Sequence, residues 1–330
     1  MTGAEQDLEA VSLSRVDATR KADTIIKNIN QVIIGKSDVV TQAVAALIAE
    51  GHILLEDVPG VGKTVLAKAL AASIAGKFKR VQFTADLLPS DITGVTIYRQ
   101  NNGEFTFRPG PLFANVLLGD EINRATPRTQ SSLLEAMEES QATVDGERYE
   151  LENPFLVMAT QNPIEYEGTF PLPETELDRF LVRITLGYPD VKNEIKLLEA
   201  QRWIHPVESL EQVISQAELT SIQNAVKEIH VEEAIREYIV GIVTATRSHP
   251  SLYLGASPRG SLALFRLSQA RALLEGRAFV LPDDVKALAL PALGHRIILN
   301  SSARIEGISV TDCVTQVLEQ IPVPGAAPGG

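Results

Sequence analysis

The sequence predicts an α/β fold with a doubly wound parallel sheet of five strands, followed by a smaller all-helical domain. Up to Tyr188, short apolar runs alternate with helix-like segments, the order typical of a parallel sheet covered by helices on both faces. After Tyr188-Pro189-Asp190 the pattern changes to successive amphipathic helices. A chain of 330 residues also exceeds what one hydrophobic core usually serves. Two domains are therefore expected.

The predicted strands are short apolar runs, as buried parallel strands usually are. They are Ile53–Leu55, Val81–Phe83, Val116–Leu118, Phe155–Met158 and Leu181–Leu186. Helical periodicity predicts helices at Asp38–Ala49, Lys63–Ala75 and Arg128–Glu138. Thr126 and Pro127 precede the last of these as a predicted N-cap and first helical residue.

Two insertions interrupt this alternation with the residues of β-hairpins. Residues 96–107 turn at Asn102-Gly103, and residues 142–151 turn at Asp145-Gly146. The sequence is equally compatible with hairpins that project for a function and with ordinary surface hairpins.

The second domain is predicted to consist of helices throughout. They are expected at Val191–Trp203, Ala217–Ile229, Glu232–Arg247, Ser257–Leu274 and Pro282–Leu293. The expected divisions of the chain are an N-terminal extension at 1–22, the α/β domain at 23–188, the helical domain at 189–321 and a flexible tail at 322–330, which is rich in Pro, Gly and Ala.

Composition argues against several classes of protein. A net charge of −12 opposes attraction to phosphate backbones, so no nucleic-acid partner is expected. The longest apolar-rich region, Val39–Leu55, is too polar to span a bilayer, and the N-terminus lacks the apolar core of a secretory signal, so we expect a cytoplasmic protein. Cys313 is the only cysteine and the five His residues are scattered, which argues against disulfides and structural zinc.

Residues 56–64, Glu-Asp-Val-Pro-Gly-Val-Gly-Lys-Thr, lie between a predicted strand and a predicted helix, the context of a phosphate-binding loop. Gly60 and Gly62 let backbone N–H groups approach phosphate oxygens at the helix N-terminus. Lys63 is expected to reach the β- and γ-phosphates of ATP, and Thr64 to ligate Mg²⁺. Asp57 replaces the usual first glycine, and we expect its carboxylate to face outward and cap the loop backbone.

Acidic and amide side chains follow two other predicted strands. Asp120 and Glu121 end an apolar run in a Walker B pattern, so Asp120 is expected in the Mg²⁺ shell and Glu121 as the group that activates water. Asn162 follows the run at Phe155–Met158 and is placed to bond both water and γ-phosphate. A turn-forming Asn before Pro163 is the alternative for that residue.

Several successive segments resemble the MoxR family of AAA+ ATPases. They are Gly110–Asn115, Asp120–Ala125, Gln130–Glu139, Ala159–Pro163, Phe170–Glu174 and, in the helical domain, Gly255–Gly260. The resemblance extends from about residue 25 to about residue 308. It implies an AAA+ P-loop core with a helical lid, ATP and Mg²⁺ as cofactors, and assembly into a ring, as a hexamer.

The resemblance also implies roles for individual residues. Asn162 would be sensor 1 and Arg259 sensor 2, while Arg179 would act as an arginine finger in the neighbouring subunit's site, with Arg183 and Arg124 as lesser candidates. A local ion pair of Arg179 with Asp178 or Glu176 is the alternative. The residues expected to hold the nucleotide are Ile33, Ile34, Gly35, Pro59, Gly60, Val61, Gly62, Lys63, Thr64 and Val65.

The function expected first is ATP-driven remodelling of protein complexes, in which the hairpins move against a client. By resemblance, that client would contain a von Willebrand factor A domain. Two alternatives are a nucleotide-dependent binding switch, against which Glu121 argues, and a helicase- or chelatase-like motor, against which the net charge argues.

Overall fold

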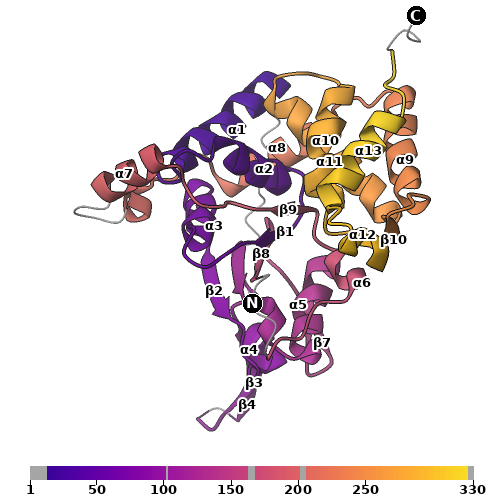
Figure 1. Cartoon of the computed structure of the whole chain (residues 1–330). Helices are drawn as coiled ribbons and strands as arrows, with labels where there is room; N and C mark the ends of the chain where they lie inside the picture. The colour runs from indigo at the N-terminus through magenta and orange to yellow at the C-terminus, as the bar shows by residue number, and fades with distance from the viewer. Residues whose placement is uncertain (1–12, 102, 163–167, 201–205, 326–330) are drawn as a thin grey trace, which may run out of the picture.

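The computed structural model describes residues 13–101, 103–162, 168–200 and 206–325. Its centre is the predicted parallel sheet of five strands (Figure 1). The strands are β1 (Ile53–Glu56), β2 (Phe78–Gln82), β5 (Val116–Asp120), β8 (Leu156–Gln161) and β9 (Val182–Ile184), in the order β2-β5-β8-β1-β9. The predicted fold class is confirmed. Strand β2 begins at Phe78, earlier than the predicted apolar run at Val81–Phe83. The start of the strand was not predicted because Lys79 and Arg80 are polar and exposed.

Two hydrophobic cores cover the two faces of the sheet. Alternate residues separate between them: Ile53 and Leu55 of β1 lie in one core, whereas Leu54 lies in the other. The first core is built with α1 (Arg15–Asn30), α2 (Ser37–Ile48) and α3 (Lys63–Ser73). The second is built with α4 (Pro89–Thr93) and α5 (Pro127–Glu139). This alternation is what parallel strands buried on both faces require.

Helix α1 was missed by the sequence analysis. It runs without interruption through residues 22 and 23, where the extension was expected to meet the domain, and it buries Ala18, Ala22 and Ile25 in the first core. Its N-terminus is capped by the Ser14 side chain, which accepts the Asp17 N–H at 3.2 Å. Its buried face includes the small or polar residues Ala18, Ala22 and Asn28 beside Ile25 and Ile29, so it was not recognised as an apolar face.

The two predicted hairpins are present. Strands β3 (Gly94–Arg99) and β4 (Glu104–Pro109) form the first, whose turn residue Asn102 lies outside the described residues. Strands β6 (Gln141–Val144) and β7 (Glu147–Glu150) form the second, and its turn has positive φ at Asp145 (52°) and Gly146 (86°), as an Asp-Gly turn predicts.

The hairpins touch each other through aromatic rings. Phe107 of β4 stacks on Tyr149 of β7, with ring centroids 4.0 Å apart. At the outer part of the first hairpin, which projects from the body (Figure 1), Tyr98 and Phe105 are 53% and 74% exposed. An exposed aromatic pair on a projecting element suits contact with another molecule.

The C-terminal half is helical, as predicted, and shares the first core with the sheet. Its elements are α7 (Val191–Ala200), α8 (Gln216–Lys227), α9 (Glu233–Arg247), α10 (Pro258–Leu274), α11 (Pro282–Leu293), α12 (Ser301–Ile305) and α13 (Val310–Gln320), with a small sheet of β10 (Leu252–Leu254) and β11 (Ile298–Leu299). Helices α12 and α13 were not predicted. The predicted end of the first helix at Trp203 and residues 326–330 of the predicted flexible tail lie outside the described residues.

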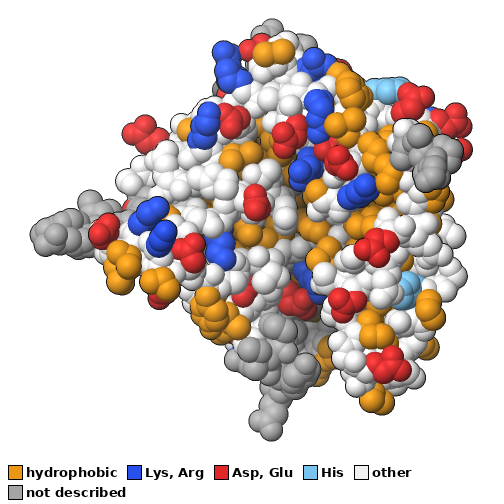
Figure 2. All heavy atoms as spheres, turned by 45° about the horizontal axis from the view of Figure 1, so that its top comes forward, with side chains coloured by type: hydrophobic (Ala, Val, Ile, Leu, Met, Phe, Trp, Pro, Cys, Tyr) orange, Lys and Arg blue, Asp and Glu red, His pale blue; other side chains and the backbone are white. Residues whose placement is uncertain are grey.

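One face of the molecule carries mixed charges. On the face drawn in Figure 2, Lys and Arg side chains are interspersed with Asp and Glu, which differs from the continuous basic stripe of a nucleic-acid footprint. Among the described residues, no helix is long and apolar enough to cross a membrane.

One buried histidine links the sheet to α5. His52 is 8% exposed; its Nδ1 accepts the Val157 N–H at 3.0 Å, and its Nε2 lies 3.0 Å from the Met137 carbonyl oxygen. An Nδ1 that accepts must be unprotonated, so the folded protein holds the neutral ring. Burial lowers the pKa of His52 from 6.5 to about 4.

We expect the free energy of unfolding to fall as the pH falls from about 6.5 to about 4, with His52 contributing about 3 kcal/mol of the loss. In that window the unfolded chain binds a proton at this residue and the folded chain does not. Urea unfolding at several pH values checks this, with His52→Gln as the comparison. An equally steep pH dependence in His52→Gln would contradict the assignment.

Candidate functional site

The loop after β1 has the backbone of a phosphate-binding loop. Gly60 and Gly62 have φ of 84° and 100°, a region that side chains with a Cβ rarely adopt. No atom lies within 4 Å of a Cβ placed on either glycine, so the space before the loop is open. Helix α3 begins at Lys63, and its N-terminus therefore faces this space.

The acidic pair lies at the carboxyl end of β5, beside that loop. Asp120 accepts the Thr160 hydroxyl at 2.6 Å through Oδ1 and Arg80 at 2.6 Å through Oδ2. Glu121 has a left-handed backbone (φ 57°, ψ 51°), a costly conformation that is typical of functional positions. Its N–H donates to the Thr160 hydroxyl at 2.8 Å, which holds the bend in place.

A single cavity of about 380 Å³ brings the predicted phosphate-binding and acidic residues together. Lys63, Thr64, Asp120, Glu121 and Asn162 all line it, and Asn162 is only 7% exposed. Pro59, Gly60 and Gly62 contribute the loop wall. The carboxyl ends of β1, β5 and β8 meet here, where doubly wound sheets bind ligands.

Two residues of β2 complete this cavity and were missed by the sequence analysis. Arg80 and Gln82 both line it; Arg80 pairs with Asp120, and the Gln82 amide donates to Glu121 Oε2 at 2.7 Å. Arg124 lies 3.2 Å from the same Glu121 oxygen. In the sequence, Arg80 and Gln82 are only two polar residues at alternate positions of a strand. Their place in the site follows from the pairing of β2 with β5.

A second cavity of about 720 Å³ adjoins the first through Gly60 and Gly62. Its walls are mainly apolar and include Ile33, Ile34, Val61 and Val65, as expected for the nucleotide. The other lining residues were not expected at the nucleotide: Val32, Lys36, Leu186, Gly187, Tyr188, Pro189, Glu194, Leu197 and Leu198. Together the two cavities offer a polar end for phosphates and an apolar end for a base.

Gly35 does not line that apolar cavity. It has a φ of 74°, and a Cβ placed on it would come within 2.0 Å of the Asn193 amide. The missing side chain lets Asn193 of α7 pack closely against Gly35, and the expected contact of Gly35 with the nucleotide stays a prediction.

Asp57 is buried, which corrects the expectation that it faces outward. Its carboxylate accepts the Val58 N–H at 2.9 Å and the Gly187 N–H at 2.7 Å, and only 5% of the residue is exposed. It does cap the loop backbone, as predicted. Its carbonyl oxygen accepts the Lys63 ammonium at 2.8 Å. Asp57 thus ties the phosphate loop to the segment after β9.

Arg179 and Arg259 lie together and away from the phosphate cavity. Both form ion pairs with Glu138 at the end of α5, the Arg179 pair at 3.2 Å. They line a separate cleft that shares no residue with the phosphate cavity. The ion pair of Arg179 is thus with Glu138. Glu176, one of the local partners weighed from the sequence, is also attracted to the Arg179 charge: burial raises the pKa of Glu176, and this attraction lowers it by a smaller amount. Arg183 pairs with Glu56 at 2.8 Å across the β1-β9 edge.

The donors at the phosphate cavity fit a magnesium ion. The Thr64 hydroxyl and the Asp120 carboxylate are hard oxygen ligands on the wall that Lys63 also lines. Mg²⁺ commonly takes one or two protein ligands and completes its shell with phosphates and water. Among the described residues, no group of three or more His, Cys, Asp or Glu is placed to hold a metal ion.

Comparison with known proteins finds similar families, sequences and structures. Residues 52–182 match the ATPase family associated with various cellular activities (AAA), and residues 244–317 match the AAA lid domain. Protein YeaC of Bacillus subtilis (strain 168) is 52% identical over 91% of this chain and 93% of its own length. Chaperone MoxR1 of Mycobacterium tuberculosis H37Rv is 39% identical over 91% of this chain and 81% of its own. A crystal structure from Cytophaga hutchinsonii superposes with a TM-score of 0.87 at 37% identity, covering 94% of this chain and 96% of that one.

Proposed function

The chain belongs to the MoxR family of AAA+ ATPases, and we propose that it works as a Mg²⁺-dependent ring ATPase that remodels protein complexes. In this proposal ATP lies across the two adjoining cavities, with its base among Ile33, Ile34 and Val65 and its phosphates against Gly60 to Thr64. Mg²⁺ held by Thr64 and Asp120 would neutralise phosphate charge.

Residues of this chain then divide the work of hydrolysis. Lys63 binds the β- and γ-phosphates, and Asn162 orients water and the γ-phosphate from the end of β8. Glu121 accepts the proton of the attacking water, and ADP leaves as the bond to the γ-phosphorus breaks. The Gln82 amide donates a hydrogen bond to Glu121 in this structure, so the Glu121 side chain must turn toward the phosphates before turnover.

The observation that carries the ring proposal is the separation of Arg179 and Arg259 from the phosphate cavity. Both guanidinium groups belong to a different cleft of the same chain. In this proposal, the two guanidinium groups complete the nucleotide site of a neighbouring copy. The contact between copies is head-to-tail and closes into a ring, which we propose is a hexamer. Glu138 holds the two cations ready on one surface.

Helix α7 supports the same assembly. It projects to one side of the body (Figure 1), with Asn193 packed on Gly35, and it exposes Val191 (75%), Ile195 (52%) and Leu198 (74%) on successive turns. A helix of ten residues is marginal in water without packing. A neighbour that brings Arg179 to this nucleotide would also cover this apolar surface.

The proposed client is a protein, and the class to test first is a protein with a von Willebrand factor A domain. The exposed aromatic pair on the β3-β4 hairpin is the contact surface we infer, and the Phe107–Tyr149 stack would make both hairpins move together.

Removal of Mg²⁺ tests the metal assignment. Phosphate release is expected to stop in EDTA and to return with added Mg²⁺. Thr64→Val, which keeps the shape of the side chain but lacks the ligand oxygen, should need a much higher Mg²⁺ concentration, whereas Thr64→Ser should resemble the wild type. Equal Mg²⁺ dependence of the Val and Ser variants would refute the ligand role of Thr64.

A further inference from the structure

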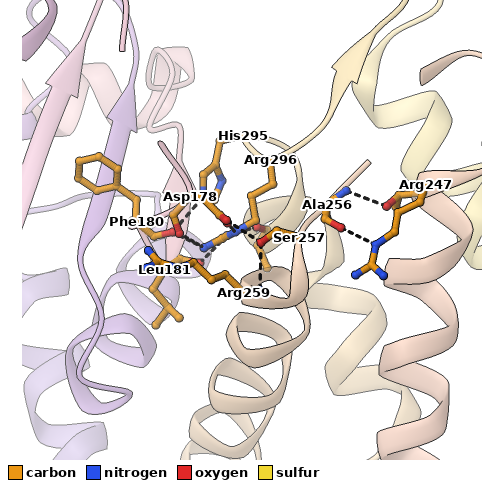
Figure 3. Close-up of polar contacts among 11 residues, drawn as sticks. Asp178, Phe180, Leu181, Arg247, Ala256, Ser257, Arg259, His295 and Arg296 are labelled. Atoms are coloured by element: carbon orange, nitrogen blue, oxygen red, sulfur yellow. Dashed lines mark hydrogen bonds and ion pairs between the residues drawn. The ribbon is translucent and has the colours of Figure 1, made fainter. Parts of the chain in front are cut away.

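A buried ion pair joins the helical half to the turn that carries Arg179. Arg296, just beyond the end of α11 at Leu293, is 3% exposed in its side chain, and its Nε donates to Asp178 Oδ1 at 2.7 Å (Figure 3). The other carboxylate oxygen, Asp178 Oδ2, accepts the Ser257 hydroxyl at 2.6 Å. Asp178 therefore binds the helical half at two places, one residue before Arg179.

Arg296 also binds the backbone on both sides of Arg179. Its Nη2 donates to the carbonyl oxygens of Asp178 (3.1 Å) and Phe180 (2.5 Å), and its Nη1 donates to that of Leu181 at 3.3 Å. The Phe180 carbonyl is also 3.0 Å from His295 Nε2. The backbone before and after Arg179 is thus held by consecutive residues of the helical half (Figure 3).

The same junction reaches Arg259. Ser257 is the N-cap of α10. Its hydroxyl oxygen accepts the Arg259 N–H at 3.0 Å, and the same hydroxyl donates a hydrogen bond to Asp178. Arg179 and Arg259 then converge on Glu138. One carboxylate, that of Asp178, therefore connects the backbones that carry both cations.

Burial makes the charged guanidinium of Arg296 energetically costly to hold. Desolvation lowers the pKa of Arg296, and the bonds to Asp178 work in the opposite direction. A buried guanidinium is retained only with good geometry and several acceptors, and its planar fork binds them in fixed directions. Those directional bonds fix the turn at residues 178–181 relative to α11 more tightly than apolar packing would.

We propose that Arg296, through Asp178 and the neighbouring carbonyl groups, positions Arg179 for the adjacent subunit's site. This inference rests on the proposed function. It makes Arg296 a positioning residue, because it touches the turn and not the nucleotide cavity of its own chain.

The test distinguishes a subunit's ability to supply Arg179 to its neighbour from the ATPase activity of its own site. Subunits with Arg179→Ala keep Glu121 and serve as acceptors; subunits with Glu121→Gln serve as donors of Arg179. Donors that also carry Arg296→Met should restore the acceptors' ATPase rate about 10- to 100-fold less well than donors with Arg296, since small misplacement of a catalytic group has effects of that size. The KM for ATP of the restored sites should stay unchanged.

The reverse arm uses Arg296→Met alone as the acceptor. Its own site is intact, so mixing with Glu121→Gln donors should recover as much activity as Arg179→Ala does. The matched control donor carries Arg277→Met, which breaks another largely buried pair of the helical half, to Asp284 at 2.6 Å, without touching residues 178–181. This control should restore the full rate.

Ring formation is followed by cross-linking in every mixture. If Arg296→Met subunits do not enter rings, Arg296→Lys replaces them; it keeps the charge, loses the fork, and should donate poorly in the same way. Full restoration by Arg296→Met or Arg296→Lys donors, or equal failure of both arms with rings present, would overturn the inference. Failure of the unmodified Arg179→Ala and Glu121→Gln mixture would instead refute the trans site itself.

Discussion

Lys63→Ala is expected to abolish ATP binding, whereas Glu121→Gln keeps binding and stops turnover. Lys63 is the cation of the phosphate loop and begins α3, so its loss removes direct neutralisation of phosphate charge. Glu121 lines the same cavity from β5 but is needed only to take a proton from water. The two variants should therefore fail at different steps.

Binding is measured with a fluorescent ATP analogue and turnover by phosphate release. Two exposed residues provide matched controls: Lys68→Ala on the same helix α3, and Glu135→Gln on α5, both expected to behave as the wild type. Normal turnover in Glu121→Gln would show that the acidic pair has been assigned wrongly. Unchanged ATP affinity in Lys63→Ala would do the same for the phosphate loop.

The parts of the site that could be predicted are those in which one short segment carries both its conformation and its chemistry. The loop around Gly60 to Thr64 combines a strand end, glycines and a helix start, so it can be recognised from the sequence without knowledge of the tertiary structure. The Asp145-Gly146 turn is another example, since it forces the type of hairpin locally.

The parts that could not be predicted depend on which segments the fold brings together. Arg80 and Gln82 acquire a role only because β2 pairs with β5, a neighbour that the chain order does not specify. Asp57 looked like a surface cap because its second partner, the Gly187 N–H, is 130 residues away. Such contacts follow from sheet order and domain packing, which a single sequence leaves open.

The placement of Arg259 shows the same limit. Arg259 lies in the first turn of α10, after Ser257 and Pro258, whose residue types are typical of an N-cap and a first helical position. The cavity that it serves was not predictable, because that depends on how the helical half docks on the sheet. The docking puts Arg259 beside Arg179 and Glu138, outside the phosphate cavity of its own chain, which supports the proposal that it serves the neighbour's nucleotide.

We expect Arg179→Ala to lower ATPase turnover about 10³- to 10⁵-fold, the range measured for arginine fingers supplied in trans. Arg179 follows α6 (Glu174–Leu177) and Asp178 and precedes β9, with 27% of its side chain exposed. Its present partner Glu138 is 41% exposed, so the pair is solvent-accessible and worth at most about 1 kcal/mol. Release of the guanidinium to a neighbour's γ-phosphate is therefore inexpensive.

Mixing shows whether the missing group acts in trans. Arg179→Ala and Glu121→Gln subunits are each inactive alone, but a mixed ring places an intact Glu121 beside a neighbour with an intact Arg179. In an equal mixture half of the sites keep Glu121 and half of those have a donor neighbour, so about a quarter of the wild-type rate should return if sites act independently. Arg183→Ala and Arg124→Ala, tested in the same way, decide between Arg179 and the lesser candidates. If mixed rings form and no activity returns, or if specific activity stays constant on dilution to monomers, Arg179 does not act between subunits.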